Sequence, residues 1–83
     1  MSKKVCLIIG GGRGMGAATA RQMHSRDYAL ALMSPTESCK TLAAELGGIA
    51  QRGRAESASD LNSVFDLTME KYGRIDSVLI HVG

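Results

Sequence analysis

A glycine-rich stretch near the start of the chain holds the residues best suited to chemistry. In order, it consists of Gly10, Gly11, Gly12, Arg13, Gly14, Met15 and Gly16. The apolar residues 5–9 precede it and a helical pattern follows it. Glycine lets a ligand approach the backbone closely, and the start of a helix offers unpaired N–H groups and a partial positive charge. The pattern predicts a strand, a turn and a helix that bind a phosphate or pyrophosphate group.

Other catalytic or metal-binding patterns are weak. Cys6 and Cys39 form neither a CxxC pair nor a metal-ligand spacing, and we interpret them as buried thiols. His24 and His81 lie in different predicted elements with no Cys or carboxylate at ligand spacing, so no metal site is expected; a surface role is predicted for His24 and a core role for His81. No lysine follows the last glycine, as a P-loop requires.

Composition narrows the class of protein and its partners. The 83 residues are 45% hydrophobic and 22% charged, which is typical of one small globular domain at most. The net charge is only +2 and the basic residues are scattered, so nucleic acid is not expected as a partner. The apolar run after Lys3 and Lys4 is too short for a signal peptide, and no run could span a membrane. A cytoplasmic protein without a membrane partner is predicted.

Four apolar runs alternate with three helical patterns. The runs over residues 4–9, 28–33, 49–54 and 77–82 predict strands, the third of them at a sheet edge. A first helix is predicted over residues 15–26, where Met15, Thr19 and Met23 recur at every fourth position, as on one face of a helix. The second begins with Ser34 as N-cap and ends at residue 46, and the third begins near residues 57–60 and ends at Tyr72.

This alternation predicts an α/β fold with a parallel sheet. We expect a Rossmann-like, incomplete doubly wound arrangement, β-α-β-α-β-α-β, with strand order 3-2-1-4. The first two helices would cover one face and the third helix the other. The fourth strand would then be an exposed apolar edge that contains Val78, Ile80 and Val82. Because such an edge needs cover, the isolated chain is predicted to be unstable, to aggregate or to form a homo-oligomer.

The glycine stretch can be aligned with known patterns in two ways. Gly12-x-Gly14-x-x-Ala17 fits the general dinucleotide fingerprint. Gly10-x-x-x-Gly14-x-Gly16 instead resembles the spacing of the short-chain dehydrogenase/reductase family. A second landmark favours the family spacing, because Gly73-Arg74-Ile75-Asp76 and the apolar strand ending in Gly83 resemble the family's fourth-strand region.

The resemblance covers the whole chain and implies an NAD(P)-dependent oxidoreductase that acts on carbonyl and alcohol substrates. Residues 1–83 would be its partial dinucleotide-binding domain, with the catalytic C-terminal half beyond Gly83. The resemblance places Gly10, Gly14 and Gly16 along the cofactor pyrophosphate. The expected cofactor contacts are Gly10, Gly11, Gly12, Arg13, Gly14, Met15, Gly16, Ser34, Arg54 and Gly83.

Three positions depart from the family pattern. Ile9 stands where the family commonly has Thr, and residues 80–83 replace Asn-Asn-Ala-Gly. Arg54 falls where the family generally carries an Asp that accepts a hydrogen bond from adenine, and arginine cannot accept one. Arg54 could stack on the base or approach a phosphate, or the register could differ and bring Glu56 nearer.

The choice of cofactor depends on charge at the end of the second strand. An acidic residue there would bind the ribose 2′-hydroxyl and favour NAD, but this chain has Ser34, Pro35 and Thr36. Arg13 matches a frequent basic residue of the family and could pair with a 2′-phosphate. The sequence therefore predicts NADP rather than NAD, although Ser34 could simply cap a helix and Arg13 could be solvated.

The catalytic residues of the family are not expected within this chain. The family uses Ser and Tyr-x-x-x-Lys, whereas Tyr28 is followed four residues later by Leu32, and Tyr72 by Asp76. The chain alone is therefore predicted to be inactive. Three functions stay open: the cofactor-binding part of an oxidoreductase, a non-catalytic nucleotide-binding regulatory module, and a structural module that associates with itself.

Overall fold

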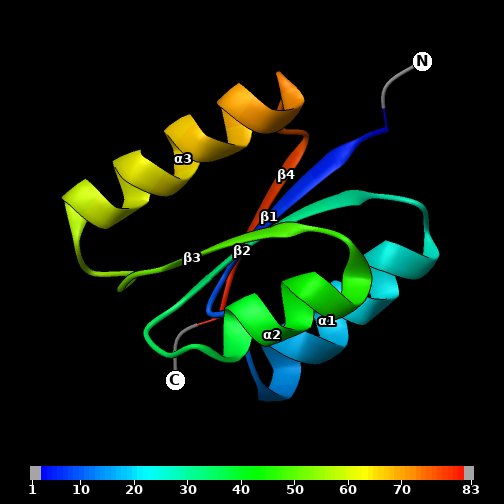
Figure 1. Ribbon diagram of the computed structural model, residues 1–83, viewed down its shortest axis with the longest axis horizontal. Coiled ribbons are helices and arrows are strands. Elements are labelled where there is room, and N and C mark those ends of the chain that lie inside the picture. Colours follow the sequence, from blue (N-terminus) through cyan, green and yellow to red (C-terminus); the bar gives the residue numbers. More distant parts are fainter. Residues whose placement is uncertain (1–2, 82–83) are drawn as a thin grey trace.

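The computed structural model of the chain describes residues 3–81, in which four strands alternate with three helices (Figure 1). The elements are β1 (Val5–Ile9), α1 (Gly14–Ser25), β2 (Ala29–Ser34), α2 (Ser38–Leu46), β3 (Ile49–Arg52), α3 (Ala58–Tyr72) and β4 (Ser77–Ile80). All strands are parallel, in the order β3-β2-β1-β4. The predicted Rossmann-like α/β fold and its strand order are confirmed.

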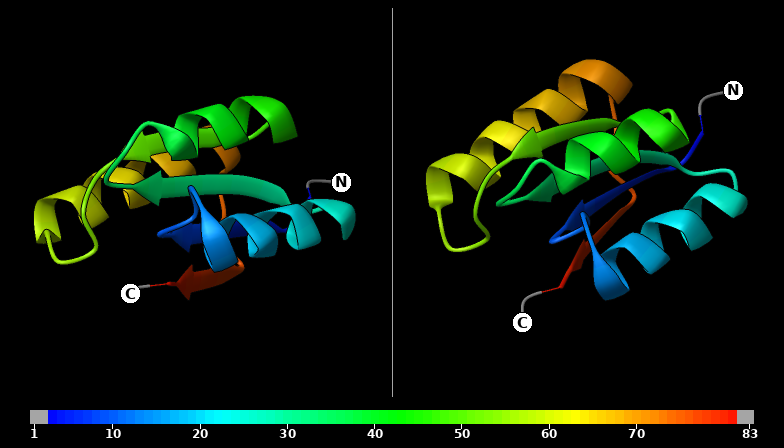
Figure 2. Two further views of the ribbon diagram at one scale, coloured as in Figure 1. Left: turned by 90° about the horizontal axis from the view of Figure 1, so that it is seen from below. Right: turned by 60° about the horizontal axis from the view of Figure 1, so that its bottom comes forward.

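The sheet is covered on both faces, by α1 and α2 on one side and by α3 on the other (Figure 2). Under α1 and α2, the buried side chains are Cys6, Ile8, Ala20, Leu30, Leu32, Cys39, Leu42 and Ala43. Under α3, they are Leu7, Ile9, Ala31, Met33 and Val64. Successive residues of β1 and β2 thus enter opposite cores, which explains why both strands are continuous apolar runs.

Two free cysteines belong to the first of these cores. Cys6 and Cys39 are both buried, as the sequence predicts. Burial raises the pKa of the Cys6 thiol above its ordinary value. A thiol held neutral in this way packs as a small apolar side chain.

Local signals at the helix ends are confirmed for α3 and for the end of α2. The Ser57 hydroxyl accepts a hydrogen bond from the Asp60 N–H at 3.2 Å and caps α3. Helices α2 and α3 end at Gly47 and Gly73, both in the left-handed conformation that glycine adopts at little cost.

The predicted start of the second helix is wrong. Ser34 is the last residue of β2 and pairs with Arg52 of β3, and its carbonyl oxygen accepts a hydrogen bond from Gly53 N–H at 2.9 Å. Its hydroxyl donates to the Thr36 carbonyl oxygen instead of capping a helix. Helix α2 begins only at Ser38, because pairing with β3 extends the strand through the residue that the capping pattern assigned to the helix.

In α1 and α3, the side chains that are buried differ from those that the helical spacing of apolar residues predicts. Met15 is 76% exposed, and α1 instead buries the small residues Gly16 and Ala20, which lets its backbone lie close to the sheet. In α3, Phe65 and Met69 are partly exposed although their spacing places them near the apolar face. Helix α3 packs over β2 and β3, and the residues that it buries there are Val64 and Thr68.

The edge strand β4 exposes apolar side chains, as predicted. Val78 is 42% and Ile80 59% exposed, while Val82 lies outside the described residues. The expected self-association of the isolated chain through this edge stays a prediction. Sedimentation velocity, which distinguishes a monomer from an oligomer, would test it. No helix among residues 3–81 is long and apolar enough to cross a membrane.

Asp76 joins the start of β4 to the start of β1. Its carboxylate accepts a hydrogen bond from Val5 N–H at 2.7 Å and another from Arg74 Nε at 2.8 Å. The bond from Arg74 and then that from Val5 lower the pKa of Asp76. Because this pKa is lower in the folded than in the unfolded chain, Asp76 stabilises the fold above its unfolded pKa. That contribution disappears as the pH falls through the folded pKa.

We therefore expect Asp76→Asn to lower the melting temperature at neutral pH, and the difference from wild type to shrink as the pH falls from neutral through the acidic range in which the Asp76 carboxylate becomes protonated. Circular dichroism melts across that range measure the effect. Glu45→Gln, which removes an exposed ion pair with Arg21, is the control and should change stability less at neutral pH. A difference for Asp76→Asn that does not vary with pH would contradict this role.

Candidate functional site

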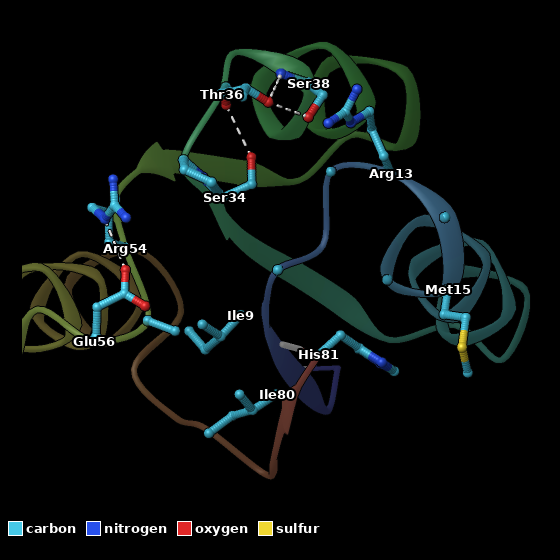
Figure 3. A pocket seen from close by; sticks show the side chains of 17 residues that line it. Ile9, Arg13, Met15, Ser34, Thr36, Ser38, Arg54, Glu56, Ile80 and His81 are labelled. Atoms are coloured by element: carbon cyan, nitrogen blue, oxygen red, sulfur yellow. Dashed lines mark hydrogen bonds and ion pairs between the residues drawn. The ribbon is translucent and has the colours of Figure 1, made fainter. Parts of the chain in front are cut away.

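A cavity of about 770 Å³ lies at the carboxyl ends of the four strands (Figure 3). Its walls come from the segments that follow β1, β2, β3 and β4. In open α/β sheets, ligands bind outside the carboxyl ends of the strands, where the strand order reverses. In this sheet β2 lies on one side of β1 and β4 on the other, so the strand order reverses at β1. The cavity lies at this point of reversal.

Most of the predicted contact residues meet in this cavity. The lining includes Gly10, Gly12, Arg13, Gly14, Met15, Gly16, Ser34 and Arg54. Gly11 does not line it: this residue is buried, and a Cβ there would meet the side chains of Ile8 and Leu32 at 3.0 and 3.2 Å. Gly83 lies outside the described residues.

The glycine loop packs tightly against β2 and the first turn of α1 and leaves open space beside Gly14. The N–H groups of Gly10 and Gly11 both donate to the Met33 carbonyl oxygen, at 2.6 and 3.2 Å, which attaches the loop to β2. A Cβ on Gly16 would lie 2.0 Å from the Gly10 carbonyl oxygen, so the first turn of α1 packs directly on the loop. Gly14, with φ of +59°, has no heavy atom within 4 Å of a built Cβ, which leaves open space beside its backbone.

The start of α1 has no side-chain cap. Its N-cap residue, Arg13, is extended and its side chain makes no capping hydrogen bond, and no acidic residue lies in the first turn. Helix α3, by contrast, has both the Ser57 cap and Asp60 in its first turn. The first N–H groups of a helix have no partners within it, and together they attract anions. The α1 start thus offers the cavity an anion-binding end.

Three hydroxyl groups form a second polar wall, which we call the hydroxyl cluster: Ser34, Thr36 and Ser38. The Thr36 and Ser38 hydroxyls are 2.8 Å apart, and Ser34 Oγ donates to the Thr36 carbonyl oxygen at 2.9 Å. A Cβ on Gly12 would lie 2.1 Å from Ser38 Oγ, so the loop touches the cluster. Figure 3 shows the Arg13 side chain extending toward Ser38.

Ser38 and Thr36 belong to the cavity wall although Ser38 is not among the residues expected from the sequence and Thr36 is expected only as a neighbour of Ser34. Hydroxyl residues at alternate positions 34, 36 and 38, directly after an apolar run, were the available signal. The three hydroxyls lie on one wall only if residue 34 belongs to the strand. The turn after the strand then brings the hydroxyls of residues 36 and 38 back over the strand end.

At the β3 end, Arg54 and Glu56 form an ion pair, with Arg54 Nε donating to Glu56 Oε1 at 2.7 Å. Their side chains are 71% and 70% exposed. The backbone of Arg54 is fixed from behind, since its N–H donates to Asp60 Oδ2 at 2.9 Å. Figure 3 shows this pair across the cavity from Arg13 and Met15.

At the β4 end, the predicted core role of His81 is wrong, because the residue is half-buried and lines the cavity. Its Nε2 lies 3.3 Å from Thr19 Oγ1. The Thr19 hydroxyl already donates its proton to the Met15 carbonyl oxygen at 2.9 Å, so Oγ1 accepts from His81 Nε2–H. His24 is exposed, as expected, and residues 3–81 contain no group of side chains that could hold a metal ion.

The sheet order, the cavity at the switch in strand order and the glycine turn define a Rossmann-like nucleotide-binding type of fold. Residues 4–83 match the model of the short chain dehydrogenase family. The chain belongs to the short-chain dehydrogenase/reductase family, an oxidoreductase family.

Named relatives support the same family. The chain is 42% identical over 72 residues to a rat 3-oxoacyl-[acyl-carrier-protein] reductase, covering 83% of this chain and 30% of the relative. It is 30% identical to carbonyl reductase family member 4 of Xenopus tropicalis, covering 96% of this chain and 35% of the relative. A crystal structure of a short-chain dehydrogenase/reductase from Brucella melitensis matches with a TM-score of 0.84 and 28% identity, covering 94% of this chain and 37% of that one. The chain thus spans about a third of the length of these relatives.

Proposed function

We propose that the chain binds NADP in this cavity and is the cofactor-binding part of a short-chain oxidoreductase. One observation carries the proposal: the uncapped start of α1 and the hydroxyl cluster with Arg13 open into the same cavity. Two anion-binding walls in one cavity suit a dinucleotide that carries both a pyrophosphate and a separate phosphate group.

The pyrophosphate would lie against the glycine loop and the start of α1. The open space beside Gly14 leaves room for it, and a side chain at that position would fill this room. The Gly16 contact with the loop holds the helix start against the strand end, so that the N–H groups are positioned before the ligand arrives.

The 2′-phosphate would lie between the hydroxyl cluster and Arg13. A guanidinium group pairs with phosphate oxygens through charge-assisted hydrogen bonds, and hydroxyl groups add further donors. Glu56 is the one acidic residue among those that line the cavity, and it lies at the β3 end. The carboxylate nearest in sequence, Glu37, lies outside the cavity lining and pairs with Arg52 and Lys40, so its charge is balanced away from the proposed phosphate site.

For the whole protein we propose hydride transfer between the nicotinamide, which supplies that chemistry, and a carbonyl or alcohol substrate. The names of the two relatives, a 3-oxoacyl reductase and a carbonyl reductase, support this class. Tyr72 has a structural role instead of a catalytic one, since its hydroxyl donates to the Leu30 carbonyl oxygen at 3.1 Å. Burial also raises its pKa, the opposite of activation. We propose that residues 1–83 alone do not turn over substrate, since neither Tyr28 nor Tyr72 is followed four residues later by a lysine.

Calorimetric titration with NADP and NAD tests the proposal. Wild type should bind NADP about tenfold more tightly, and Arg13→Ala should bring the ratio near one, because the ion pair with the extra phosphate is lost. Arg26→Ala, at the other end of α1, is the matched control and should leave the ratio unchanged. Equal affinities in wild type, or a ratio that ignores Arg13, would contradict NADP selection. Failure to bind either cofactor would favour the structural association module.

A further inference from the structure

The Arg54–Glu56 pair lies where the base of the bound dinucleotide would reach, an assignment that rests on the proposed function. The phosphates occupy the ends of β1 and β2 in that proposal, and the ribose with the 2′-phosphate carries the base. From the hydroxyl cluster, the next strand across the sheet is β3, whose end presents residues 53–56 to the cavity. The base is therefore expected at Arg54 and Glu56.

The segment that presents the pair is rigidly attached. Gly53 N–H donates to the Ser34 carbonyl oxygen at 2.9 Å, and Ser57 N–H donates to the Arg54 carbonyl oxygen at 3.0 Å. A Cβ on Gly53 would lie 2.7 Å from the sulfur of Met33, so this backbone packs directly on the core. The two side chains thus project from a fixed position.

The pair offers both a donor and an acceptor. Among residues 3–81, Glu56 is the one partner of the Arg54 guanidinium, and it engages only Nε and Oε1. The two terminal amino groups of Arg54 stay available as donors, and the second carboxylate oxygen of Glu56 as an acceptor. Both side chains are largely exposed, so a ligand can reach these atoms.

We propose that this pair makes the site tolerant of the base at its six-position. Adenine carries an amino donor there, which Glu56 can accept, while Arg54 donates to a ring nitrogen. Hypoxanthine carries a carbonyl acceptor, to which Arg54 donates, while Glu56 accepts from the neighbouring ring N–H. A carboxylate alone would accept from the amino group of adenine, whereas beside hypoxanthine it could reach the ring N–H only with the carbonyl oxygen, which it repels, next to it.

The test compares NADP with its hypoxanthine analogue by calorimetry. The quantity compared is the dissociation constant of the analogue divided by that of NADP, so a higher ratio means a stronger preference for adenine. Wild type should bind the two within about threefold of each other. Arg54→Asp leaves acceptors only and should favour adenine by about tenfold or more, whereas Glu56→Ala leaves donors only and should lower the ratio below the wild-type value. Each ratio cancels the general effect of changed charge on an anionic ligand. Arg52→Asp, at the end of β3 and outside the cavity lining, is the control and should keep the wild-type ratio.

A wild-type preference for adenine of about tenfold or more would overturn the proposal. So would a ratio that stays the same in both Arg54→Asp and Glu56→Ala, with circular dichroism showing that each variant is folded. The NADP dissociation constant itself reports on the proposed function, and its ratio to that of the analogue reports on base tolerance. Absence of NADP binding to wild type would therefore overturn both, while NADP binding with a contradictory ratio would overturn base tolerance alone.

Discussion

Replacing Gly16 by alanine is expected to destabilise the fold by about 3 kcal/mol and to abolish detectable NADP binding. The added Cβ would lie 2.0 Å from the Gly10 carbonyl oxygen and 2.8 Å from Gly11 Cα, and both are backbone atoms that cannot rotate away. The helix must then separate from the loop, which removes the N–H groups from the cavity. At an ordinary helix position the same change stabilises by up to about 1 kcal/mol, so the sign of the effect is diagnostic. Urea unfolding and calorimetry measure the two effects.

Gly14→Ala and Gly47→Ala are the matched controls. Both residues have a left-handed φ, +59° and +74°, with no atom within 4 Å of a built Cβ. Each variant should lose about 1 kcal/mol through backbone strain. Only Gly14→Ala should also weaken NADP binding, because only its Cβ enters the proposed pyrophosphate site. If Gly16→Ala behaves like Gly47→Ala in both measurements, the loop does not position α1 as described.

Thr36→Asp should reverse the cofactor preference from NADP to NAD. The new carboxylate would stand in the hydroxyl cluster, where repulsion of the 2′-phosphate amounts to about 3 kcal/mol, or about a hundredfold in the NADP dissociation constant. NAD should bind at least as well as before, since the carboxylate can accept from the ribose hydroxyls. Thr36 is a better choice than Ser34, because Thr36 is exposed whereas a carboxylate at Ser34 would be buried against Gly12.

Thr41→Asp places the same charge on α2 outside the cavity lining and serves as the control. It should weaken NADP binding far less than Thr36→Asp does. Equal losses in the two variants would mean that the effect is a general one of net charge, and the 2′-phosphate would not lie at the hydroxyl cluster.

The fold could be predicted because each of its signals is local. The buried runs of β1 and β2, the Ser57 cap and the terminal Gly47 each depend on a few neighbouring residues. Strand order then follows from the general topology of parallel sheets. Ser34 was misassigned because its capping pattern is also local, whereas the hydrogen bond from Gly53 that keeps it in β2 comes from another strand.

The candidate site was only partly predictable for the same reason. A glycine loop between a strand and a helix is recognisable from adjacent residues, and its lining of the cavity needs no distant partner. The contact of Gly12 with Ser38 and the His81–Thr19 hydrogen bond join residues far apart in the sequence, and they exist only once the strands lie side by side. Arg54 stood out in the sequence, but its pairing with Glu56 required the backbone conformation after β3.

The most direct test of the central claim is amide chemical-shift mapping of the ¹⁵N-labelled wild-type chain during titration with NADP. We expect the largest changes at the amides of Gly12, Gly14, Met15, Gly16 and Ser38. The amides of Gly47 and Gly73, at the far ends of α2 and α3, should stay unchanged. Changes concentrated on α3 and β4, or no changes at saturating NADP, would contradict the claim that the glycine loop and the hydroxyl cluster bind the cofactor.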